Sequence, residues 1–308
     1  MTNKIVAIQG NHPSKLNPKT DTSVFLAHEI QNKNYKIFYY DPKELSVINS
    51  EVIASGFFIK FDYKDKNFFK ILKKQKLALT KCKFILIRQD PPFNLEYISA
   101  TYILDTIKDK VKILNNPTSI RNISEKLYSV RYQKFMPSTI FTQNISEIKN
   151  FFKTHKKVII KPIHSYGGND IHLLNRFNSK FINQFIKKHD HIMCQKFLPK
   201  INKGDKRVFL INGKVCGAIS RVPKQGSFLS NMSKGAKPIS IELTKTEKKI
   251  SKLIAKDLKK ENIFFAGIDF IDQKLNGDIN VTSPTGLKTL YDLSGVNLAK
   301  TFWKELKA

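Results

Sequence analysis

Residues 266–286 read Ala-Gly-Ile-Asp-Phe-Ile-Asp-Gln-Lys-Leu-Asn-Gly-Asp-Ile-Asn-Val-Thr-Ser-Pro-Thr-Gly, and this stretch decides both the fold and the expected chemistry. Two apolar runs separated by a polar turn that ends in Gly277 predict a β-hairpin. Because side chains alternate along a strand, Asp278 and Asn280 share a face, and Asp269 on the preceding strand can meet them. Two carboxylates and an amide oxygen are ligands that suit Mg²⁺. The apolar neighbours indicate a buried sheet, which favours a metal site over ordinary exposed hairpin polarity.

A second polar segment is a strand followed by a glycine loop, residues 157–168. The strand delivers Lys161 to its end, where a lysine suits a phosphate oxygen. Gly167 and Gly168 let the backbone approach a polyphosphate and present N–H groups to it. The spacing is neither that of a Walker A loop nor that of a dinucleotide fingerprint. A simple hairpin with a solvated lysine is the alternative.

A third segment is an apolar strand that stops at Pro199 and is followed by Gly-Asp-Lys-Arg at residues 204–207. Such a strand can line an adenine with backbone groups and an aliphatic wall. Asp205 could then receive ribose hydroxyls, and Arg207 could face phosphates. Taken alone, this segment fits an ordinary core strand with a polar turn better than it fits a nucleotide site.

Apolar periodicity divides the chain into two parts. In the first part, strands alternate with helices, which predicts a parallel α/β sheet over residues 1–115; the strands are 4–9, 35–40, 83–88 and 112–115, and the helices are 22–31 and 95–107. The second part predicts an α+β region with strands at 157–161, 171–174, 192–197 and 207–211 and a basic amphipathic helix at 246–260.

The length and composition fit a globular protein of two or three substructures. The chain has 308 residues, of which 41% are hydrophobic, and no run approaches the roughly 18–20 apolar residues of a membrane span. Residues 1–10 predict a first strand rather than a signal peptide. Cys82, Cys194 and Cys216 form neither a disulfide framework nor a zinc pattern. We therefore expect a cytoplasmic protein with no membrane partner.

The net charge of +29 raises the alternative of a nucleic-acid-binding module. Against it, the basic residues are spread along the chain, lysine dominates over arginine, and no helix-turn-helix, zinc-finger or aromatic-glycine RNA motif accompanies them. Nucleic acid is therefore not the expected partner. The positive field would still help to collect small anionic substrates.

In their order along the chain, these segments resemble the ATP-grasp ligases, and most closely the bacterial type of glutathione synthetase. The resemblance runs from about residue 80 to 290, and it is carried by Arg88-Gln-Asp-Pro-Pro-Phe-Asn, Ala100-Thr-Tyr-Ile-Leu-Asp, Asn115-Asn-Pro-Thr-Ser-Ile-Arg, Ser124-Glu-Lys-Leu, Lys161-Pro, Gly204-Asp-Lys-Arg, Arg221-Val-Pro and Asn280-Val-Thr-Ser-Pro-Thr-Gly. It implies an ATP-grasp fold preceded by a Rossmann-like N-terminal α/β domain. The expected boundaries are 1–122 for the N-terminal domain, 123–198 for a central lid subdomain, and 199–308 for a C-terminal subdomain with the metal and substrate site.

The resemblance also assigns roles to residues of this sequence. Those expected to bind ATP are Lys126, Lys161, Gly167, Gly168, Gln195, Lys196, Phe197, Leu198 and Asp205. Those expected to steady the transferring phosphate and the acyl phosphate are Arg207 and Arg221. Magnesium, with manganese as an alternative, would be held by Asp269, Asp278 and Asn280. The peptide and amine substrates would lie near Asp21, Thr22, Arg88, Ser283, Thr285 and Gly286.

The activity implied by the resemblance is ligation of γ-glutamylcysteine to glycine through an acyl phosphate, giving glutathione, ADP and phosphate. The partners are then small molecules, and the family suggests a homo-oligomer, either a tetramer or a dimer. Another ATP-grasp ligase that joins a different carboxylate and amine is the alternative. The acyl phosphate must be kept from water, and residues 225–235 are where the family places a closing loop.

Three positions depart from the family's usual pattern. Asp278 stands where glutamate is usual, so its carboxylate is one methylene shorter. The loop at 225–235 has Leu229 near the position of a usual arginine, and Lys224 or Lys234 are candidates to supply the missing charge. Lys288 falls where arginine or glutamine is common. These differences bear on turnover and on the acceptor amine more than on ATP binding.

Overall fold

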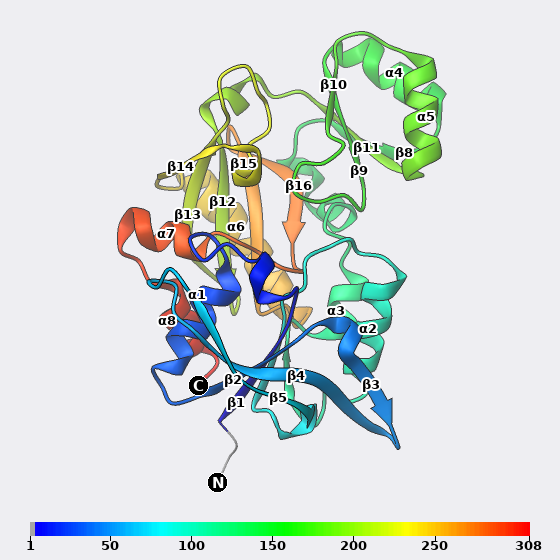
Figure 1. The fold of residues 1–308 in the computed structure, drawn as a ribbon. Coiled ribbons are helices and arrows are strands. Elements are labelled where there is room, and N and C mark those ends of the chain that lie inside the picture. The colour runs from blue at the N-terminus through cyan, green and yellow to red at the C-terminus, as the bar shows by residue number, and fades with distance from the viewer. Residues whose placement is uncertain (1–3) are drawn as a thin grey trace.

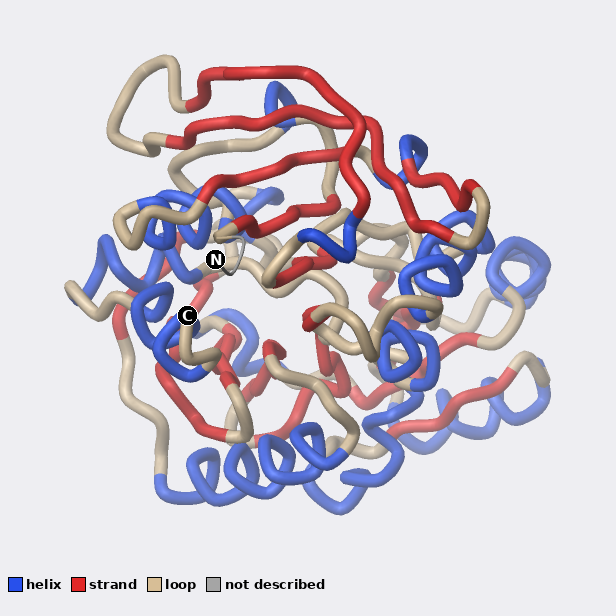
Figure 2. Tube along the Cα trace, turned by 90° about the horizontal axis from the view of Figure 1, so that it is seen from below, coloured by secondary structure: helices blue, strands red, loops and turns tan. Residues whose placement is uncertain are grey.

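The computed structural model describes residues 4–308 and arranges its strands in three sheets (Figure 1). The sequence analysis predicted a first strand rather than a signal peptide in residues 1–10. Residues 1–3 of this segment lie outside the described residues. Viewed from below, the long strands of the N-terminal sheet lie at one side of the molecule, apart from the other strands (Figure 2). The N-terminal sheet contains β1 (Ile5–Gln9), β2 (Lys36–Tyr40), β3 (Leu45–Ile48), β4 (Glu51–Phe61), β5 (Phe69–Ala78), β6 (Phe84–Ile87) and β7 (Lys112–Leu114).

The N-terminal sheet is parallel only in part. β2, β1, β6 and β7 are parallel neighbours in that order, as the alternation of strands and helices predicted. The prediction of a parallel sheet throughout residues 1–115 was wrong, because β3, β4 and β5 pair in antiparallel fashion beside β2. Four of the ten residues of β5 are lysines, which hides it from a search for apolar strands. An edge strand tolerates such charges because one side of it faces solvent.

Helices α1 (Thr22–Gln31), α7 (Leu287–Ser294) and α8 (Leu298–Glu305) fill the space between the N-terminal sheet and the C-terminal sheet. α1 begins where the Asp21 carboxylate accepts a hydrogen bond from the backbone N–H of Val24 at 2.9 Å. The indole of Trp303, fully buried in α8, donates to the carbonyl of Leu26 at 2.9 Å. The last helices of the chain are thus part of the core under the first helix. The other N-terminal helices are α2 (Leu95–Asp105) and α3 (Pro117–Asn122).

The middle of the chain forms a four-stranded antiparallel sheet in the order β10-β9-β11-β8, set apart at the upper right of Figure 1. Helices α4 (Ile145–His155) and α5 (Ser179–His189) cover one face of it. Their apolar stripes, which include Ile148 and Ile182, pack on Val158 and Ile160 and leave the opposite face free to line a cleft. The strands are β8 (Thr139–Thr142), β9 (Val158–Pro162), β10 (His172–Leu174) and β11 (Ile192–Lys196).

The C-terminal part forms a five-stranded antiparallel sheet in the order β14-β13-β12-β15-β16. Helix α6 (Lys245–Lys260), the predicted amphipathic helix, packs its apolar side on one face and begins at a capping box made by Thr244 and Glu247. The Asn115 amide joins this sheet to the N-terminal one, because it donates to the carbonyls of Phe265 and Val281 at 2.8 and 2.6 Å. The strands are β12 (Asp205–Ile211), β13 (Lys214–Val222), β14 (Lys237–Ser240), β15 (Phe265–Ile271) and β16 (Lys274–Asn280).

Candidate active site

A cleft of about 950 Å³, part of it open to solvent, lies between the four-stranded and five-stranded sheets. It brings together segments that are far apart in the sequence. Every residue predicted to act in ATP binding, metal binding or catalysis lines this cleft: Lys126, Lys161, Gly167, Gly168, Gln195, Lys196, Phe197, Leu198, Asp205, Arg207, Arg221, Asp269, Asp278 and Asn280.

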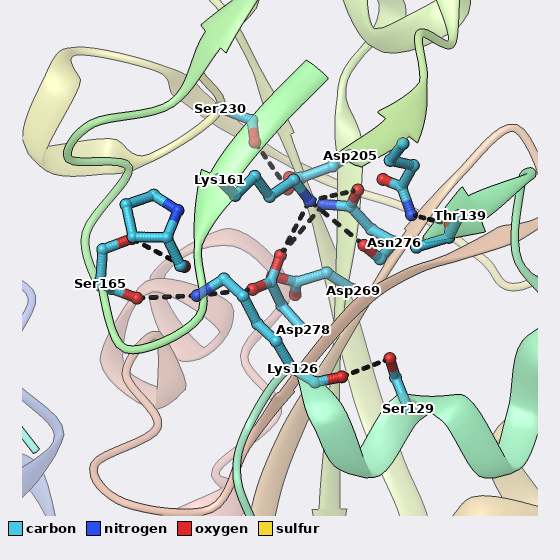
Figure 3. A network of polar contacts seen from close by, with 12 residues as sticks. Lys126, Ser129, Thr139, Lys161, Ser165, Asp205, Ser230, Asp269, Asn276 and Asp278 are labelled. Carbon is cyan, nitrogen blue, oxygen red and sulfur yellow. Dashed lines mark hydrogen bonds and ion pairs between the residues drawn. The ribbon is translucent and has the colours of Figure 1, made fainter. Parts of the chain in front are cut away.

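Two buried lysines converge on one carboxylate at the floor of the cleft (Figure 3). The Nζ atoms of Lys126 and Lys161 lie 3.5 and 3.4 Å from the two carboxylate oxygens of Asp278. Lys126 also donates to the carbonyl of Ser165 at 2.7 Å, and Lys161 donates to the amide oxygen of Asn276 at 3.1 Å. Burial alone would raise the pKa of Asp278, but the two lysines hold it below its usual value. We call Lys126, Lys161, Asn276 and Asp278 the lysine cluster.

The shape of β16 aims these polar side chains into the cleft. Leu275 and Ile279 are buried in the core, whereas the alternate residues Asn276, Asp278 and Asn280 line the cleft. Phe270 pairs with Leu275 and Ile268 with Ile279, so a single residue of β15 faces three residues of β16. This is a bulge, a feature that re-aims side chains beside functional sites.

Gly277 makes the bulge possible. Its φ of +84° belongs to the left-handed region, and a Cβ there would lie 2.5 and 2.8 Å from the methyl carbons of Met193 and Met136. Asn276 was not predicted as a site residue. The period of two that placed Asp278 and Asn280 on one face could have found it.

Two arginines and two carboxylates form a second group on the adjacent strands. Arg207 makes two hydrogen bonds to Asp269, one of them 2.9 Å long, and Arg221 donates to Asp269 at 2.9 Å. Arg221 also makes a two-pronged contact with Asp205, with 2.8 Å from Nε to the carboxylate. Burial would raise the pKa of Asp269, but Arg207 and Arg221 lower it to about 2. We call Arg207, Arg221, Asp205 and Asp269 the arginine cluster.

The neighbouring backbone makes room for the arginine cluster. Gly267 on β15 has no side chain, and a Cβ there would lie 2.9 Å from Cδ of Arg207. The Asp205 carboxylate is also held by the Ser230 hydroxyl at 2.6 Å. To receive ribose hydroxyls as predicted, Asp205 would have to share oxygens that already accept bonds from Arg221 and Ser230. Its role at a ribose therefore stays a prediction.

One part of the cleft lining is apolar and was only partly predicted. Phe197 and Leu198 line it together with Ile159 and Ile171, which sequence patterns did not separate from ordinary core residues. The Gln195 side chain is buried and donates to the Thr139 hydroxyl at 3.0 Å. An apolar slot with a few backbone polar groups suits a planar base.

Two loops meet over the cleft. Gly167 and Gly168 have φ values of +64° and +77°, and a side chain at Gly168 would collide with Asn231. The predicted closing loop therefore touches the glycine loop. Leu229 and Ser230 from that loop line the cleft, but neither Lys224 nor Lys234, the candidates for the missing charge, is part of its lining.

The predicted substrate residues form a separate group beside the cleft. Arg88, at the end of β6, donates to the Ser23 hydroxyl at 3.1 Å and to the carbonyl of Pro284 at 3.0 Å. Its third nitrogen, Nη1, is buried and has no partner among the described residues. The structure thus brings Arg88 to the start of α1 and to the 283–286 loop. However, the main cleft is lined by none of the six predicted substrate residues, which are Asp21, Thr22, Arg88, Ser283, Thr285 and Gly286.

Oxygen donors at the lysine cluster fit a divalent cation. Asn280 Oδ1 is buried and has no hydrogen-bond partner within the described part of the chain. The Asp278 carboxylate lies in the same lining and is held only by contacts of 3.4 Å or more. A carboxylate beside an unpartnered amide oxygen is a hard donor set of the kind Mg²⁺ takes. Asp269 fits less directly, because its oxygens already accept three hydrogen bonds from the arginines.

Fold and site together define an ATP-grasp ligase. Solved structures with this fold include the ATP-grasp ligase PsnB complexed with a phosphomimetic variant of a minimal precursor, Mg and ADP (TM-score 0.65, 13% identity, 100% of this chain and 98% of that one). Others are the D-cycloserine synthetase DcsG (0.66, 9%, 98% and 99%) and D-alanyl-alanine synthetase A from Vibrio cholerae (0.60, 14%, 96% and 95%). Enzymes of this class use ATP and Mg²⁺.

The chain belongs to the prokaryotic glutathione synthetase family. The family's N-terminal domain matches residues 5–121 and its ATP-grasp domain matches residues 125–295. The glutathione synthetase of Bradyrhizobium diazoefficiens is 33% identical over 98% of this chain and 97% of its own length. Those of Buchnera aphidicola subsp. Baizongia pistaciae and Prochlorococcus marinus are 34% and 35% identical, covering 93% and 92% of this chain and 90% and 92% of their own lengths.

The predicted family, fold class and reaction class are thereby confirmed. The protein is an ATP-dependent carbon–nitrogen ligase of the glutathione synthetase kind. Among the described residues, no helix is both long and apolar enough to cross a membrane.

Proposed function

We propose that this ligase performs glutathione synthesis in the cleft between the two sheets, with phosphate transfer at the lysine cluster. The observation that carries this proposal is the convergence of Lys126 and Lys161 on Asp278, at 3.5 and 3.4 Å, from segments on either side of the cleft. Two cations face one carboxylate there, which leaves positive charge for the phosphates of ATP.

In the first step, a carboxylate oxygen of γ-glutamylcysteine attacks the γ-phosphorus of ATP, and the bond to ADP breaks. Both reactants are anions, so their repulsion is a large part of the barrier. Lys126 and Lys161 hold the phosphates, and Arg207 and Arg221 stabilise the charge that moves during the transfer. The product is an acyl phosphate.

In the second step, the amine of glycine attacks the acyl carbon, phosphate leaves, and the amine loses a proton to form the peptide bond. The acyl phosphate must not meet water before the amine does. Leu229 and Ser230 from one loop and Gly167 and Gly168 from the other line the cleft, which supports their role as its cover.

Asp278 and Asn280 would hold Mg²⁺, or Mn²⁺ in its place, with Asp269 sharing its oxygens between the arginines and the metal. When bound, the cation neutralises phosphate charge and orients the γ-phosphate. Asp278 and Asn280 are the better supported ligands, because one is loosely paired and the other has an unpartnered oxygen.

The remaining assignments follow from position. The apolar end of the cleft, with Gln195, Lys196, Phe197 and Leu198, takes the adenine, and Asp205 takes the ribose side. Arg88 and the 283–286 loop take the peptide and glycine, with Asp21 and Thr22 beside them, since Arg88 Nη1, which has no partner among the described residues, suits a carboxylate.

We further propose domain limits of 1–122, 123–198 and 199–308, a cytoplasmic location, and a homo-oligomer of two or four chains. The three sheets fall within these limits, at residues 5–114, 139–196 and 205–280. Size-exclusion chromatography with light scattering would measure the oligomer.

Phosphate release from ATP tests the proposed function. The purified protein should release phosphate only when both γ-glutamylcysteine and glycine are present, and Lys126→Met should abolish this release. Lys134→Met, at an exposed position outside the cleft, is the matched control and should leave it unchanged. Equal or greater turnover with another pair of carboxylate and amine would show a different ATP-grasp ligase.

A further inference from the structure

The loop of residues 225–235, all of which the structure describes, reaches the main cleft without a charged side chain. Its residues in the lining of the cleft are Phe228, Leu229, Ser230 and Asn231. Lys224 and Lys234, the candidates for the missing charge, are not part of that lining. The loop is therefore held over the cleft by its hydrogen bonds and its packing, and not by a cation placed on the phosphates.

The two ends of this loop meet at its base. The side chain of Lys224 lies across Gly235, because a Cβ on Gly235 would come within 2.1 Å of Cε of Lys224. Gly235 also has a φ of +88°, which glycine adopts without strain. A compact surface loop whose ends lie together is of the Ω type. Lys224 thus packs the base of the loop, and the position of the tip depends on the contacts that the tip itself makes.

Two of the contacts at the tip are weak. Asn231 packs against the glycine loop, where a Cβ on Gly168 would lie 2.3 Å from its Oδ1 atom. The Sδ atom of Met232 accepts a hydrogen bond from the Thr289 hydroxyl of α7 at 3.8 Å. A thioether is a weak acceptor, and a single packing contact contributes little. These contacts locate the tip between the glycine loop and α7 but do not hold it firmly.

The strongest contact of the tip is made by Ser230. Its hydroxyl donates to the carboxylate of Asp205 at 2.6 Å (Figure 3). Ser230 is 8% exposed and Asp205 is 1% exposed, so little water competes for this bond. Hydrogen bonds to an ionised acceptor are about twice as strong as those between neutral groups, and burial strengthens them further. The bond from Ser230 to Asp205 is therefore the main obstacle to lifting the tip.

The same carboxylate connects the loop to the arginine cluster. Oδ2 of Asp205 accepts hydrogen bonds from Ser230 and from Nη2 of Arg221, and Arg221 also donates to Asp269 at 2.9 Å. Oδ1 of Asp205 accepts only from Nε of Arg221 among the described residues, so it keeps a lone pair for a ribose hydroxyl. Closure of the loop thus adds a donor to the group that holds Arg221, without using the oxygen that is left for the ribose.

We propose that the Ser230 hydroxyl holds the loop of residues 225–235 closed through its hydrogen bond to Asp205, which we call the Ser230 latch. The inference rests on the proposed function and adds to it the residue on which loop closure depends in this chain. Ser230 does so one position after Leu229, where the family resemblance led us to expect an arginine. It is a positioning residue, because it acts on the reaction through the loop and through Asp205.

Loss of the Ser230 latch gives water access to the acyl phosphate. The water oxygen then attacks the acyl carbon, the bond from that carbon to phosphate breaks, and a proton is released. The products are γ-glutamylcysteine with its carboxylate restored and free phosphate. ATP is consumed and no peptide bond forms, so the effect of the latch is measured by the ratio of phosphate released to glutathione formed.

Three serine variants test this inference at saturating ATP, Mg²⁺, γ-glutamylcysteine and glycine. The wild-type protein should release about one phosphate per glutathione, whereas Ser230→Ala should release about two or more. Without glycine, phosphate release in Ser230→Ala should rise about fivefold or more over wild type. Ser230→Thr keeps a hydroxyl and should return the ratio toward the wild-type value. Ser233→Ala, at an exposed position of the same loop that lies outside the cleft lining, is the matched control and should leave the ratio unchanged.

Limited trypsin digestion measures the position of the loop independently of turnover. Lys224 and Lys234 are exposed, and cleavage after both releases the peptide of residues 225–234, which mass spectrometry detects. Cleavage of a transiently opened segment follows the population of its open form. With saturating ATP and Mg²⁺, Ser230→Ala should release this peptide about tenfold faster than wild type, and Ser233→Ala should release it at the wild-type rate. Thermal unfolding of each variant confirms that it is folded.

The two measurements separate the latch from the proposed function. If the wild-type protein makes glutathione, an unchanged phosphate ratio or an unchanged cleavage rate in Ser230→Ala would overturn the Ser230 latch and leave the proposed function standing. A wild-type protein inactive with γ-glutamylcysteine and glycine would overturn the proposed function. The cleavage rates require only ATP and Mg²⁺, so they would still decide whether Ser230 holds the loop.

Discussion

The arginine cluster and the lysine cluster line the same cleft but are built in opposite ways. In the arginine cluster, each carboxylate accepts two-pronged contacts, and the hydrogen bonds from Arg221 to Asp205 and Asp269 measure 2.8 and 2.9 Å. In the lysine cluster, the two ion pairs measure 3.4 and 3.5 Å. We call the arginine cluster the closed group, because its hydrogen bonds are short and paired. We call the lysine cluster the loose group, because its ion pairs are longer.

The two clusters also differ in net charge. Two arginines face two carboxylates, so the arginine cluster is neutral and internally satisfied. The lysine cluster contains two lysines and one carboxylate, so it has an excess positive charge of its own, and the nearby Asn280 has a side-chain oxygen without a partner among the described residues. A closed group of this kind is a rigid part of the scaffold, whereas a loose group with excess charge is completed by a ligand.

Substitution of Asp269 should have the largest effect, because it breaks the closed group. Asp269→Asn leaves two buried arginines short of a partner and removes a proposed metal ligand. We expect a loss of unfolding free energy of about 3–5 kcal/mol, together with loss of phosphate release by about 10³-fold or more. Urea unfolding and the phosphate assay measure the two effects. Asp109→Asn, at an exposed position, is the control, and unchanged activity in Asp269→Asn would remove Asp269 from the site.

Asp278→Asn should separate activity from stability. Lys126 and Lys161 keep carbonyl and amide acceptors at Ser165 and Asn276, so we expect unfolding free energy to change by about 1 kcal/mol or less. Activity should still fall by about 10²-fold or more. Calorimetry should show that Mg²⁺ no longer strengthens ATP binding, while binding of Mg-free ATP is retained. A loss of stability as large as that of Asp269→Asn would contradict the contrast between the clusters.

Low pH should weaken the closed group in a predictable window. Asp269 has a folded pKa of about 2, below the roughly 3.9 of an unfolded aspartate, so its contribution to stability is nearly complete at about pH 5 and is lost as pH falls through 2. The difference in unfolding free energy between wild type and Asp269→Asn should shrink by about 2 kcal/mol between pH 5 and pH 2. A difference that stays constant from pH 5 to pH 2 would mean that the arginines do not hold the carboxylate ionised.

The contrast between the clusters also shows what sequence patterns can and cannot supply. The period of two along β16 is enough to place Asp278 and Asn280 on one face, because strand geometry is local. The pairing of Arg221 with Asp205 depends on β12 lying beside β13, and no local sequence pattern predicts that these two strands are neighbours. In the same way, Lys126 joins the site only because a turn at the junction of two sheets brings it there.

The fold, too, was predicted only where the signal in the sequence is local. The parallel strands and the helices α1, α2 and α6 were predicted within a few residues, since each carries its own apolar period, whereas the sequence analysis gave no bounds for the other α-helices. The β4–β5 hairpin was missed, because lysines at Lys70, Lys73, Lys74 and Lys76 mask a strand that is stable only through its partner. A second pocket, lined by Phe93, Ile123, Ile163 and Thr282, could not be predicted either, since it exists only where four chain segments meet.

Asp278→Glu should have the smallest effect, and it tests how closely the loose group is fitted to its own side chain. The substitution keeps the charge and adds one methylene, giving the residue that the family resemblance led us to expect at this position. The contacts of 3.4 and 3.5 Å to Lys161 and Lys126 leave room for a longer carboxylate, so we expect kcat to stay within about threefold. A Mg²⁺ titration of phosphate release measures the change in metal dependence. A loss of tenfold or more would show that the bulge at Gly277 is built around the shorter side chain, and the lysine cluster would then be as closely fitted as the arginine cluster.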